Sequence, residues 1–382
     1  MGISTDRDLL DTVARIGPVI REHADEAEAG RRLSAPVMDA MRGAGLFRML
    51  APRSLGGLEV DPMTFARVAE AVARHDPAAG WALQAGNVGD FFAARLPDEG
   101  VEEIVGDDPD QLMAAAFHPP MEGVAVDGGY RISGRRPLAS TIRDSSWLFV
   151  TAVVGEGAVA AVVRADEAQV VDTWYSLGMR GTDSNDVLLE DVLVPARRTF
   201  PLMPDFEPGS HHGGPLYRMS AVSALAIVLA PIALAIASEA IEALRALAPA
   251  KTSMGSMRAL AGRPVAQARL ARAEGSVRAG RALLHTTLEE SWARVVAGGR
   301  PTLEERAGDL LAGAHAVASA VEAVDLVYGV AGSSGIYERS RIERCFRDVQ
   351  TIRHHGFVCE SRLEAVGQVL LGVEPEFALV AF

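Results

Sequence analysis

The sequence predicts an α+β protein in which one compact β region separates two helical regions. Apolar residues recur at helical spacing through the first hundred residues. Short runs rich in Val and Ile then alternate with Gly, Asp and Pro, and three long stretches with few helix breakers fill the last third. We therefore expect an N-terminal helical domain at residues 1–110, a central β domain at 111–205 and a C-terminal helical bundle at 206–382.

The N-terminal helices are indicated by their apolar stripes and by their ends. Leu9, Val13, Ile16 and Ile20 lie on one helical face. A later stripe ends before Asp76-Pro77, because a residue that precedes proline disfavours helical backbone angles.

The β region begins with a strong hairpin signal. Val124–Val126 and Tyr130–Ile132 flank Asp127-Gly128-Gly129, which is typical of a tight turn between antiparallel strands. Further strands are expected at residues 147–154, 159–163, 170–174 and 187–194.

Long helices follow a Gly- and Pro-rich loop at residues 201–217 that contains His211-His212. They are expected within residues 260–296, 304–330 and 347–372, as in a helix bundle. Met219–Ser238 contains no charged residue and is about as long as a membrane span. Because it is Ala-rich, contains Pro231 and is followed at once by amphipathic helices, we expect a buried bundle helix and no membrane partner.

Composition excludes several classes of function. The formal net charge of -13 disfavours nucleic-acid binding. Cys345 and Cys359 show no disulfide or metal spacing, and the nine histidines form no metal-binding pattern, so no metal is expected. Charged residues near Met1 argue against a signal peptide and for a cytoplasmic location. No Gly-x-Gly-x-x-Gly unit for a dinucleotide is present.

Four local patterns, in the right order, resemble the acyl-CoA dehydrogenase superfamily over nearly the whole chain. Residues 129–141 are similar to that family's strand pair against the flavin ring, and residues 178–195 to its Gly-x-Arg-Gly-Ser and Glu-Asp-Val stretch. Residues 258–267 resemble a segment whose arginine contacts flavin phosphate, often across a subunit boundary, and residues 332–348 resemble its Gly-rich turn and Arg-x-x-Arg-Asp motif. The resemblance implies an N-terminal helical domain, a central β-barrel and a C-terminal four-helix bundle.

One departure from the dehydrogenase pattern decides the expected chemistry. Dehydrogenases of this family often place a catalytic glutamate where this chain has Gly356, and abstraction of a proton needs such a base. His355, in register with Arg347-Asp348, instead resembles the two-component flavin-dependent monooxygenases of the same fold. Glu360, one helical turn further on, keeps an acyl-CoA dehydrogenase or oxidase with FAD open. A flavin-less scaffold of this fold is a third alternative.

The monooxygenase resemblance implies a full set of cofactors and partners. Reduced flavin, FMNH2 or FADH2, would react with O2 to give a C4a-hydroperoxyflavin that hydroxylates an aromatic or heterocyclic small molecule. A separate NAD(P)H-dependent flavin reductase would supply the reduced flavin, and a homo-oligomer, as a dimer of dimers, is expected.

The same resemblance assigns candidate site residues. His355 and Ser140 are the expected catalytic residues, and Trp81 and Asn87 are expected near the substrate. Many relatives carry a second active-site histidine about eight residues after that tryptophan, but this chain has none there. The residues expected to bind the flavin are Ser140, Thr141, Gly181, Thr182, Ser184, Arg258 and Arg347.

Overall fold

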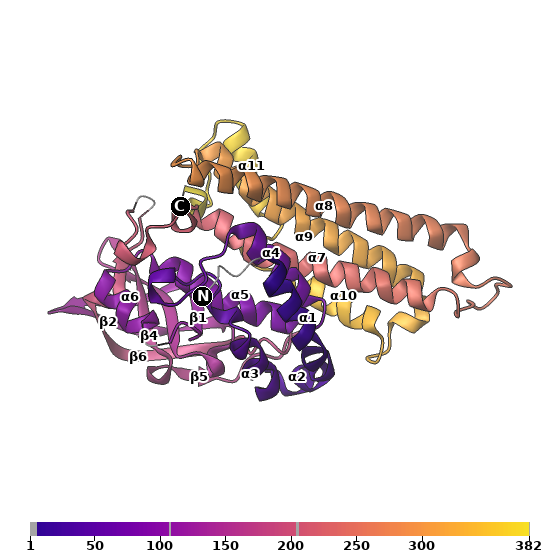
Figure 1. Cartoon of the computed structure of the whole chain (residues 1–382), viewed down its shortest axis with the longest axis horizontal. Coiled ribbons are helices and arrows are strands. Elements are labelled where there is room, and N and C mark those ends of the chain that lie inside the picture. The colour runs from indigo at the N-terminus through magenta and orange to yellow at the C-terminus, as the bar shows by residue number, and fades with distance from the viewer. Residues whose placement is uncertain (1–5, 107, 204–205, 382) are drawn as a thin grey trace.

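The computed structural model describes residues 6–106, 108–203 and 206–381 and has three parts (Figure 1). Helices come first, a β-sheet follows, and long antiparallel helices extend away from the sheet. The N-terminal helices are α1 Asp6–Glu22, α2 Ala24–Gly30, α3 Ala35–Gly43, α4 Pro62–Ala73, α5 Pro77–Ala93 and α6 Asp98–Val105. The predicted α+β order is confirmed. The expected boundary between the β domain and the bundle, at residues 205–206, falls at residues 204–205, which lie outside the described residues.

Helix α5 is the central element of the N-terminal part. Every residue of α5 is buried, because the helix packs between strand β1 and helix α7. A helix that is covered on all sides can be apolar all round. Its start is defined by Asp76-Pro77, as the sequence predicts. This packing places Trp81, on the first turns of α5, between the sheet and the bundle.

The central part is one seven-stranded sheet with the order β5-β6-β2-β1-β3-β4-β7. The predicted hairpin joins β1 to β2 in antiparallel register, with Gly128 at a φ of 76° in the turn. Within the described residues, β5 and β7 end the hydrogen-bonded order of this sheet, which is the expected central β domain. Both edge strands have only three residues. The strands are β1 Met113–Val126, β2 Gly129–Ala139, β3 Trp147–Val154, β4 Gly157–Arg164, β5 Gln169–Val171, β6 Asn185–Pro195 and β7 Thr199–Pro201.

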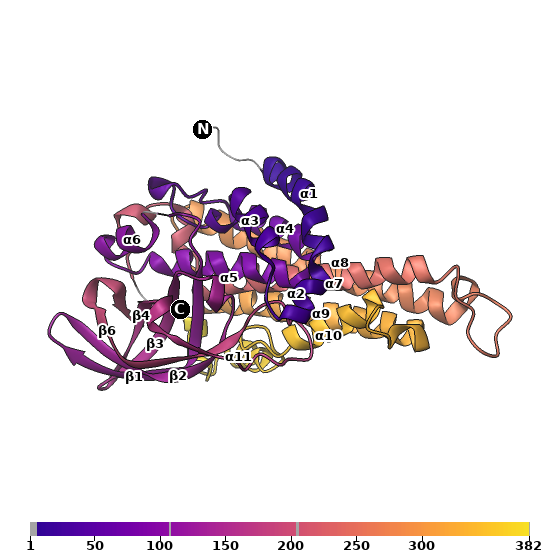
Figure 2. The same ribbon diagram turned by 90° about the horizontal axis from the view of Figure 1, so that it is seen from below.

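The C-terminal part is the expected bundle, in which α7 to α10 pack together (Figure 2). Its helices are α7 Ala221–Leu247, α8 Pro264–Val296, α9 Leu303–Ala331, α10 Arg341–Ile352 and α11 Arg362–Leu370. Helices α7 and α9 are long and apolar enough to cross a membrane, but 93% of the most apolar window of α7 is buried inside the protein. The predicted helix across residues 347–372 is interrupted by turns at 353–361, and His355 lies in those turns rather than on a helix.

A buried charge network joins the three parts of the molecule at α10. Arg344 donates to the Asp348 carboxylate at 2.8 Å and forms ion pairs with Glu28 of α2 at 3.1 Å and Asp76 before α5 at 3.5 Å. The backbone N–H of Met179 donates to the other Asp348 oxygen at 2.6 Å, which attaches a loop of the β domain. Burial lowers the pKa of Arg344, but the three carboxylates outweigh it, so the net pKa is raised and the guanidinium stays charged.

We predict that Arg344→Met destabilises the folded protein by about 3–5 kcal/mol, because it leaves buried carboxylates without a counter-charge. Urea unfolding followed by circular dichroism measures this change. Arg339→Met, at an exposed arginine just before α10, is the matched control and should cost little. Equal stability of the two variants would show that the network is not a structural clamp.

Candidate active site

Three segments that are distant in sequence meet where α5 passes the sheet and the end of α10. They are the first turns of α5, the residues that follow β2, and the turns after α10. The indole N–H of Trp81 donates to the Ser140 hydroxyl at 2.9 Å. The Trp81 ring also meets the His355 ring edge to face, with centroids 5.3 Å apart. The predicted residues Trp81, Ser140 and His355 are therefore brought together in one site.

A chain of hydroxyl groups continues from Ser140 into the sheet. Ser140 Oγ lies 2.7 Å from Ser184 Oγ, and Ser184 Oγ lies 2.7 Å from Thr182 Oγ1. Thr182 Oγ1 donates to the Met179 carbonyl at 2.8 Å. The predicted residues Thr182 and Ser184 thus lie beside Ser140, which is the one part-exposed hydroxyl of the three.

Counting hydrogens fixes the direction of this chain, because each hydroxyl has one hydrogen to donate. The Thr182 hydrogen is used on the Met179 carbonyl, so Ser184 must donate to Thr182. Ser140 must then donate to Ser184, while it accepts from Trp81. The Ser140 oxygen therefore offers a bound ligand a lone pair and no hydrogen, so its best partner is an N–H or O–H group.

The backbone around these hydroxyls adopts unusual angles. Leu138, Thr141, Met179 and Asp183 all have positive φ values, of 66°, 58°, 54° and 50°. Such angles cost a non-glycine residue of order 1 kcal/mol or more and cluster at functional sites. The Thr141 N–H donates to the Thr182 carbonyl at 2.8 Å, and an Arg143–Asp183 ion pair holds the second loop. Local interactions thus hold two loops in a strained and fixed arrangement.

The rim of this arrangement is apolar and exposed. Leu138, Tyr175 and Leu177 leave 57%, 73% and 56% of their surfaces open to solvent. Leu138 lies two residues before Ser140, and Leu177 two residues before Met179, and exposed apolar side chains beside buried polar groups are typical of a ligand site. A flat, mostly apolar ring system with polar atoms along one edge, such as the isoalloxazine of flavin, fits this combination of an apolar rim and a hydroxyl edge.

His355 is a part-exposed imidazole with aromatic neighbours. Burial lowers its pKa to about 4, so the ring is neutral at pH 7. The backbone N–H of Phe357 points to Nδ1 at 3.5 Å, which favours the tautomer with the hydrogen on Nε2. Phe357 also packs on the ring at 5.6 Å, so His355 stands in an apolar setting as a neutral donor at Nε2.

Two predicted site residues have structural roles instead. The Asn87 side chain is fully buried and bonds to the backbone of Leu46, Leu50 and Leu83, so it cannot bind substrate and that prediction is wrong. Arg347 is held by Glu343 and Glu28 in ion pairs, so the predicted flavin contact is replaced by a role in packing α10 against α2. Glu343 lies four residues before Arg347 on the same helix and is a local signal, whereas Glu28 is distant in the chain and could not be anticipated.

Of the remaining predicted residues, Gly181 and Thr141 have packing roles, and the predicted flavin contact of Arg258 is not tested by the structure. Gly181 permits close packing, since a Cβ there would lie 2.9 Å from the Cβ of Ala78. Thr141 is buried and positions the loop after β2. Arg258 is exposed in the connection between α7 and α8, at the end of the bundle away from the sheet (Figure 1). Its contact with flavin phosphate would need a second copy of the chain and stays a prediction.

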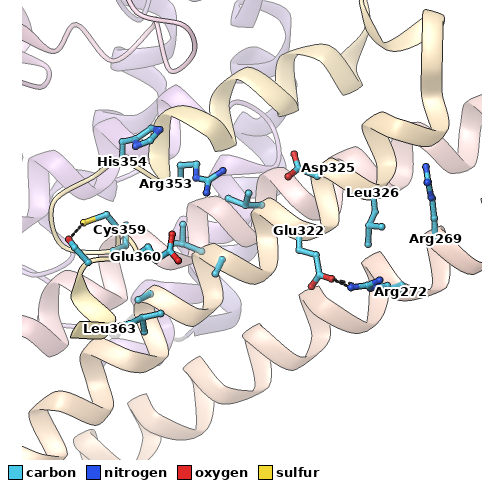
Figure 3. A pocket seen from close by; sticks show the side chains of 16 residues that line it. Arg269, Arg272, Glu322, Asp325, Leu326, Arg353, His354, Cys359, Glu360 and Leu363 are labelled. Carbon is cyan, nitrogen blue, oxygen red and sulfur yellow. Dashed lines mark hydrogen bonds and ion pairs between the residues drawn. The ribbon is translucent and has the colours of Figure 1, made fainter. Parts of the chain in front are cut away.

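A separate cavity of about 770 Å³ lies on the other side of the turns after α10 (Figure 3). It is lined by His354 and Glu360, and by an Arg272–Glu322 ion pair of 2.6 Å between α8 and α9. Figure 3 shows Glu360 among the side chains that line this cavity, whereas His355, Trp81 and Ser140 are not among its lining residues. The alternative base of the dehydrogenase hypothesis is therefore not positioned beside Trp81 and Ser140.

Comparison with known proteins identifies the family. Residues 5–93 match the N-terminal domain of acyl-CoA dehydrogenases, and residues 227–360 match the C-terminal domain. The chain is 31% identical to an indole-3-acetate monooxygenase of Pseudomonas putida, over 93% of this chain and 91% of that protein. The chain belongs to the flavin-dependent monooxygenases of the acyl-CoA dehydrogenase superfamily.

Two further relatives support the assignment of this oxygenase to the family. It is 27% identical to the flavin-dependent monooxygenase oxygenase subunit HsaA of Mycobacterium tuberculosis, over 91% of both chains. Its structure matches XiaF of Streptomyces sp., solved with FADH2 and glycerol, with a TM-score of 0.91, 25% identity and coverage of 97% and 96% of the two chains. The sequence predictions of the fold and of a flavin-dependent monooxygenase are thus confirmed.

Sequence reasoning missed the aromatic neighbours of His355 in the oxygenase. Phe117 of β1 contacts Phe357 at 6.0 Å, and neither residue belongs to a motif. Phe357 follows His355-Gly356 closely in sequence, which is a local signal. Phe117 is in a strand almost 240 residues earlier, so only the fold brings it to the site.

The lowered pKa of His355 predicts a loss of stability in acid. The unfolded chain binds a proton near the ordinary pKa of 6.5, whereas the folded protein resists protonation until about pH 4. The stability that the neutral His355 ring contributes is therefore fully present above pH 6.5 and decreases as the pH falls toward 4. Between pH 7 and pH 5, the oxygenase should lose about 1–2 kcal/mol more than its His355→Gln variant, with an allowance for the ring's partial exposure.

Urea unfolding at the two pH values measures this difference. His354→Gln, at the exposed neighbouring histidine, is the control and should follow the original protein. If His355→Gln lost as much stability on acidification as that control, the inference that the His355 ring is neutral at pH 7 would be refuted.

Proposed function

We propose that this chain is the oxygenase component of a two-component system that uses reduced flavin and O2 to hydroxylate a small aromatic or heterocyclic compound. The observation that carries the proposal is the meeting of His355, Trp81 and the Ser140 hydroxyl chain beside aromatic rings. The named activities of relatives, on indole-3-acetate and on resorcinol, support an aromatic or heterocyclic substrate. A separate NAD(P)H-dependent reductase would provide the reduced flavin, while the cytoplasmic location and the homo-oligomer stay predictions.

The residues of the site suit reduced flavin. Ser140 presents a lone pair, and reduction places an additional N–H on the flavin ring system, which that lone pair can accept. Leu138 and Tyr175 offer apolar surface for a flat ring. When bound, the reduced flavin supplies the activation of O2, and the protein supplies binding, orientation and a dry setting.

His355 would orient the substrate and, after a change of tautomer, receive its proton. Its Nε2–H can donate to a polar group on the substrate, and the apolar surroundings exclude water that would compete. Receipt of a phenol proton at Nε2 would need the other neutral tautomer, with the hydrogen on Nδ1 and the 3.5 Å contact from the Phe357 N–H given up. The cationic imidazole that then forms beside the anionic oxygen would offset the cost of charging the ring. A neutral ring at rest is thus compatible with acid–base catalysis.

The site favours this function over an acyl-CoA dehydrogenase. A dehydrogenase needs a carboxylate beside the flavin edge to remove a proton from carbon. Among the described residues near Ser140, the buried carboxylate of Asp183 is paired with Arg143, and Glu360 lines the other cavity. Neither is placed to act as that base.

We predict that His355→Ala lowers turnover by about 10²–10⁴-fold, which is the usual contribution of general acid–base assistance. Flavin binding should be largely retained, because the hydroxyl edge and apolar rim remain. The assay supplies flavin, a flavin reductase and NADH, and detects incorporation of ¹⁸O from ¹⁸O2 into indole-3-acetate or a phenol by mass spectrometry. His354→Ala is the control. Unchanged turnover would remove His355 from the mechanism, and no ¹⁸O with any aromatic compound would count against the proposed function.

The direction of the hydroxyl chain gives a second prediction. In Ser184→Ala, the Ser140 hydrogen has no acceptor and becomes available to the ligand, so the preference for a ligand N–H weakens. The ratio of the Kd for oxidised flavin to the Kd for reduced flavin should fall about three- to tenfold, the effect of one hydrogen bond. Anaerobic titrations with both forms measure this ratio.

Ser145→Ala provides a control for this experiment, because Ser145 contacts Thr141 and lies outside the chain of hydroxyls. Its ratio should equal that of the original protein. A ratio that does not change in Ser184→Ala would mean that Ser140 does not bind flavin in the direction inferred.

A further inference from the structure

A second series of rings leads away from His355 on the side opposite Trp81. Phe357 contacts Phe117 at 6.0 Å and Phe377 at 6.3 Å, and these three rings come from the turns after α10, strand β1 and the C-terminal segment. All three are part-exposed, as is His355. The polar edge of the site is therefore continued by an aromatic surface that a substrate ring can pack on.

Arg362 stands at the far end of this series, in the first turn of α11. Its guanidinium lies 3.8 Å above the centre of the Phe377 ring, which fixes its orientation by a cation–π contact. Its Nη2 donates to the Ser361 hydroxyl at 3.0 Å. Its Nε is buried and has no acceptor within the part of the chain that the structure describes.

Arg362 also lacks a counter-charge, although the chain has 50 acidic and 37 basic residues. No carboxylate of the described residues lies within ion-pair distance of it. Glu360 and Glu364, its near neighbours in sequence, are exposed and do not pair with it. By contrast, Arg344 and Arg347 of the preceding helix each have at least two acidic partners. A guanidinium without a counter-charge leaves its terminal N–H groups available to an anionic ligand.

We propose that Arg362 binds the carboxylate of the substrate, and that the substrates of this oxygenase are aromatic compounds with a carboxylate side chain. This inference rests on the proposed function, because it concerns the substrate of that reaction. The aromatic ring packs on Phe357 and Phe117, next to His355, and the carboxylate reaches the guanidinium above Phe377. A carboxylate accepts N–H groups from arginine, and it would bind at the terminal Nη atoms of Arg362, because the buried Nε is closed to it.

Binding of a matched pair of probes tests the proposal without turnover. 1-Naphthylacetate and 1-naphthylacetamide have the same ring and nearly the same shape, but only the first has a charge. Isothermal titration of the full-length protein should give a Kd for the carboxylate about ten- to a hundredfold lower than for the amide. In Arg362→Gln this preference should disappear, while the Kd for the amide stays the same.

Two further variants make the result specific. Arg362→Lys keeps the charge but loses the planar pair of donors, so part of the preference should remain. Arg353→Gln, at an arginine of the same segment that lines the other cavity, should keep the full preference. Thermal unfolding verifies that each variant is folded.

The proposal is overturned if the original protein binds the carboxylate no tighter than the amide or binds neither at millimolar concentration. It is also overturned if Arg362→Gln keeps the preference. These outcomes are separate from the proposed function, because the titration needs no flavin and no oxygen. A protein that shows the Arg362-dependent preference but incorporates no ¹⁸O would keep this inference and lose the monooxygenase assignment.

Discussion

The Arg344–Asp348 pair is the interaction on which the geometry of the molecule depends. Burying two charges is costly unless each has several partners, and here Glu28, Asp76 and the Met179 N–H supply them. These partners come from the N-terminal helices and from the β domain, while the pair itself belongs to the bundle. One buried network thus fixes the relative positions of all three parts, which no local interaction could do.

The active site follows directly from that network. The Met179 N–H that binds Asp348 begins the loop that carries Thr182 and Ser184, so the bundle holds the start of the hydroxyl chain. Seven residues after Asp348, the chain leaves α10 and presents His355 to Trp81. The polar edge and the imidazole are therefore positioned by the same carboxylate, and their distance is set by the fold rather than by flexible side chains.

Sequence reasoning succeeded where the signal is local and was wrong where distant segments decide. The β1–β2 hairpin and the break at Asp76-Pro77 depend on neighbouring residues, and both were predicted. Asn87 was assigned to the substrate because it follows Trp81, but its partners Leu46 and Leu50 lie in a different segment that only the fold brings close. Likewise, strand β7 was not predicted, because its three residues carry too little pattern and only pairing with β4 defines it.

The absence of a carboxylate beside His355 is a chemical feature and not a result of crowding. A side chain at Gly356 would meet open space, so packing does not impose glycine there. A carboxylate buried as deeply as the His355 ring would be driven toward its neutral, protonated form, because burial penalises the charge. The same burial drives an imidazole toward its neutral form, which can still donate at Nε2 to a polar or anionic group of the substrate. The environment that makes a poor site for removing a proton from carbon therefore makes a good one for holding a polar aromatic substrate against a reduced flavin.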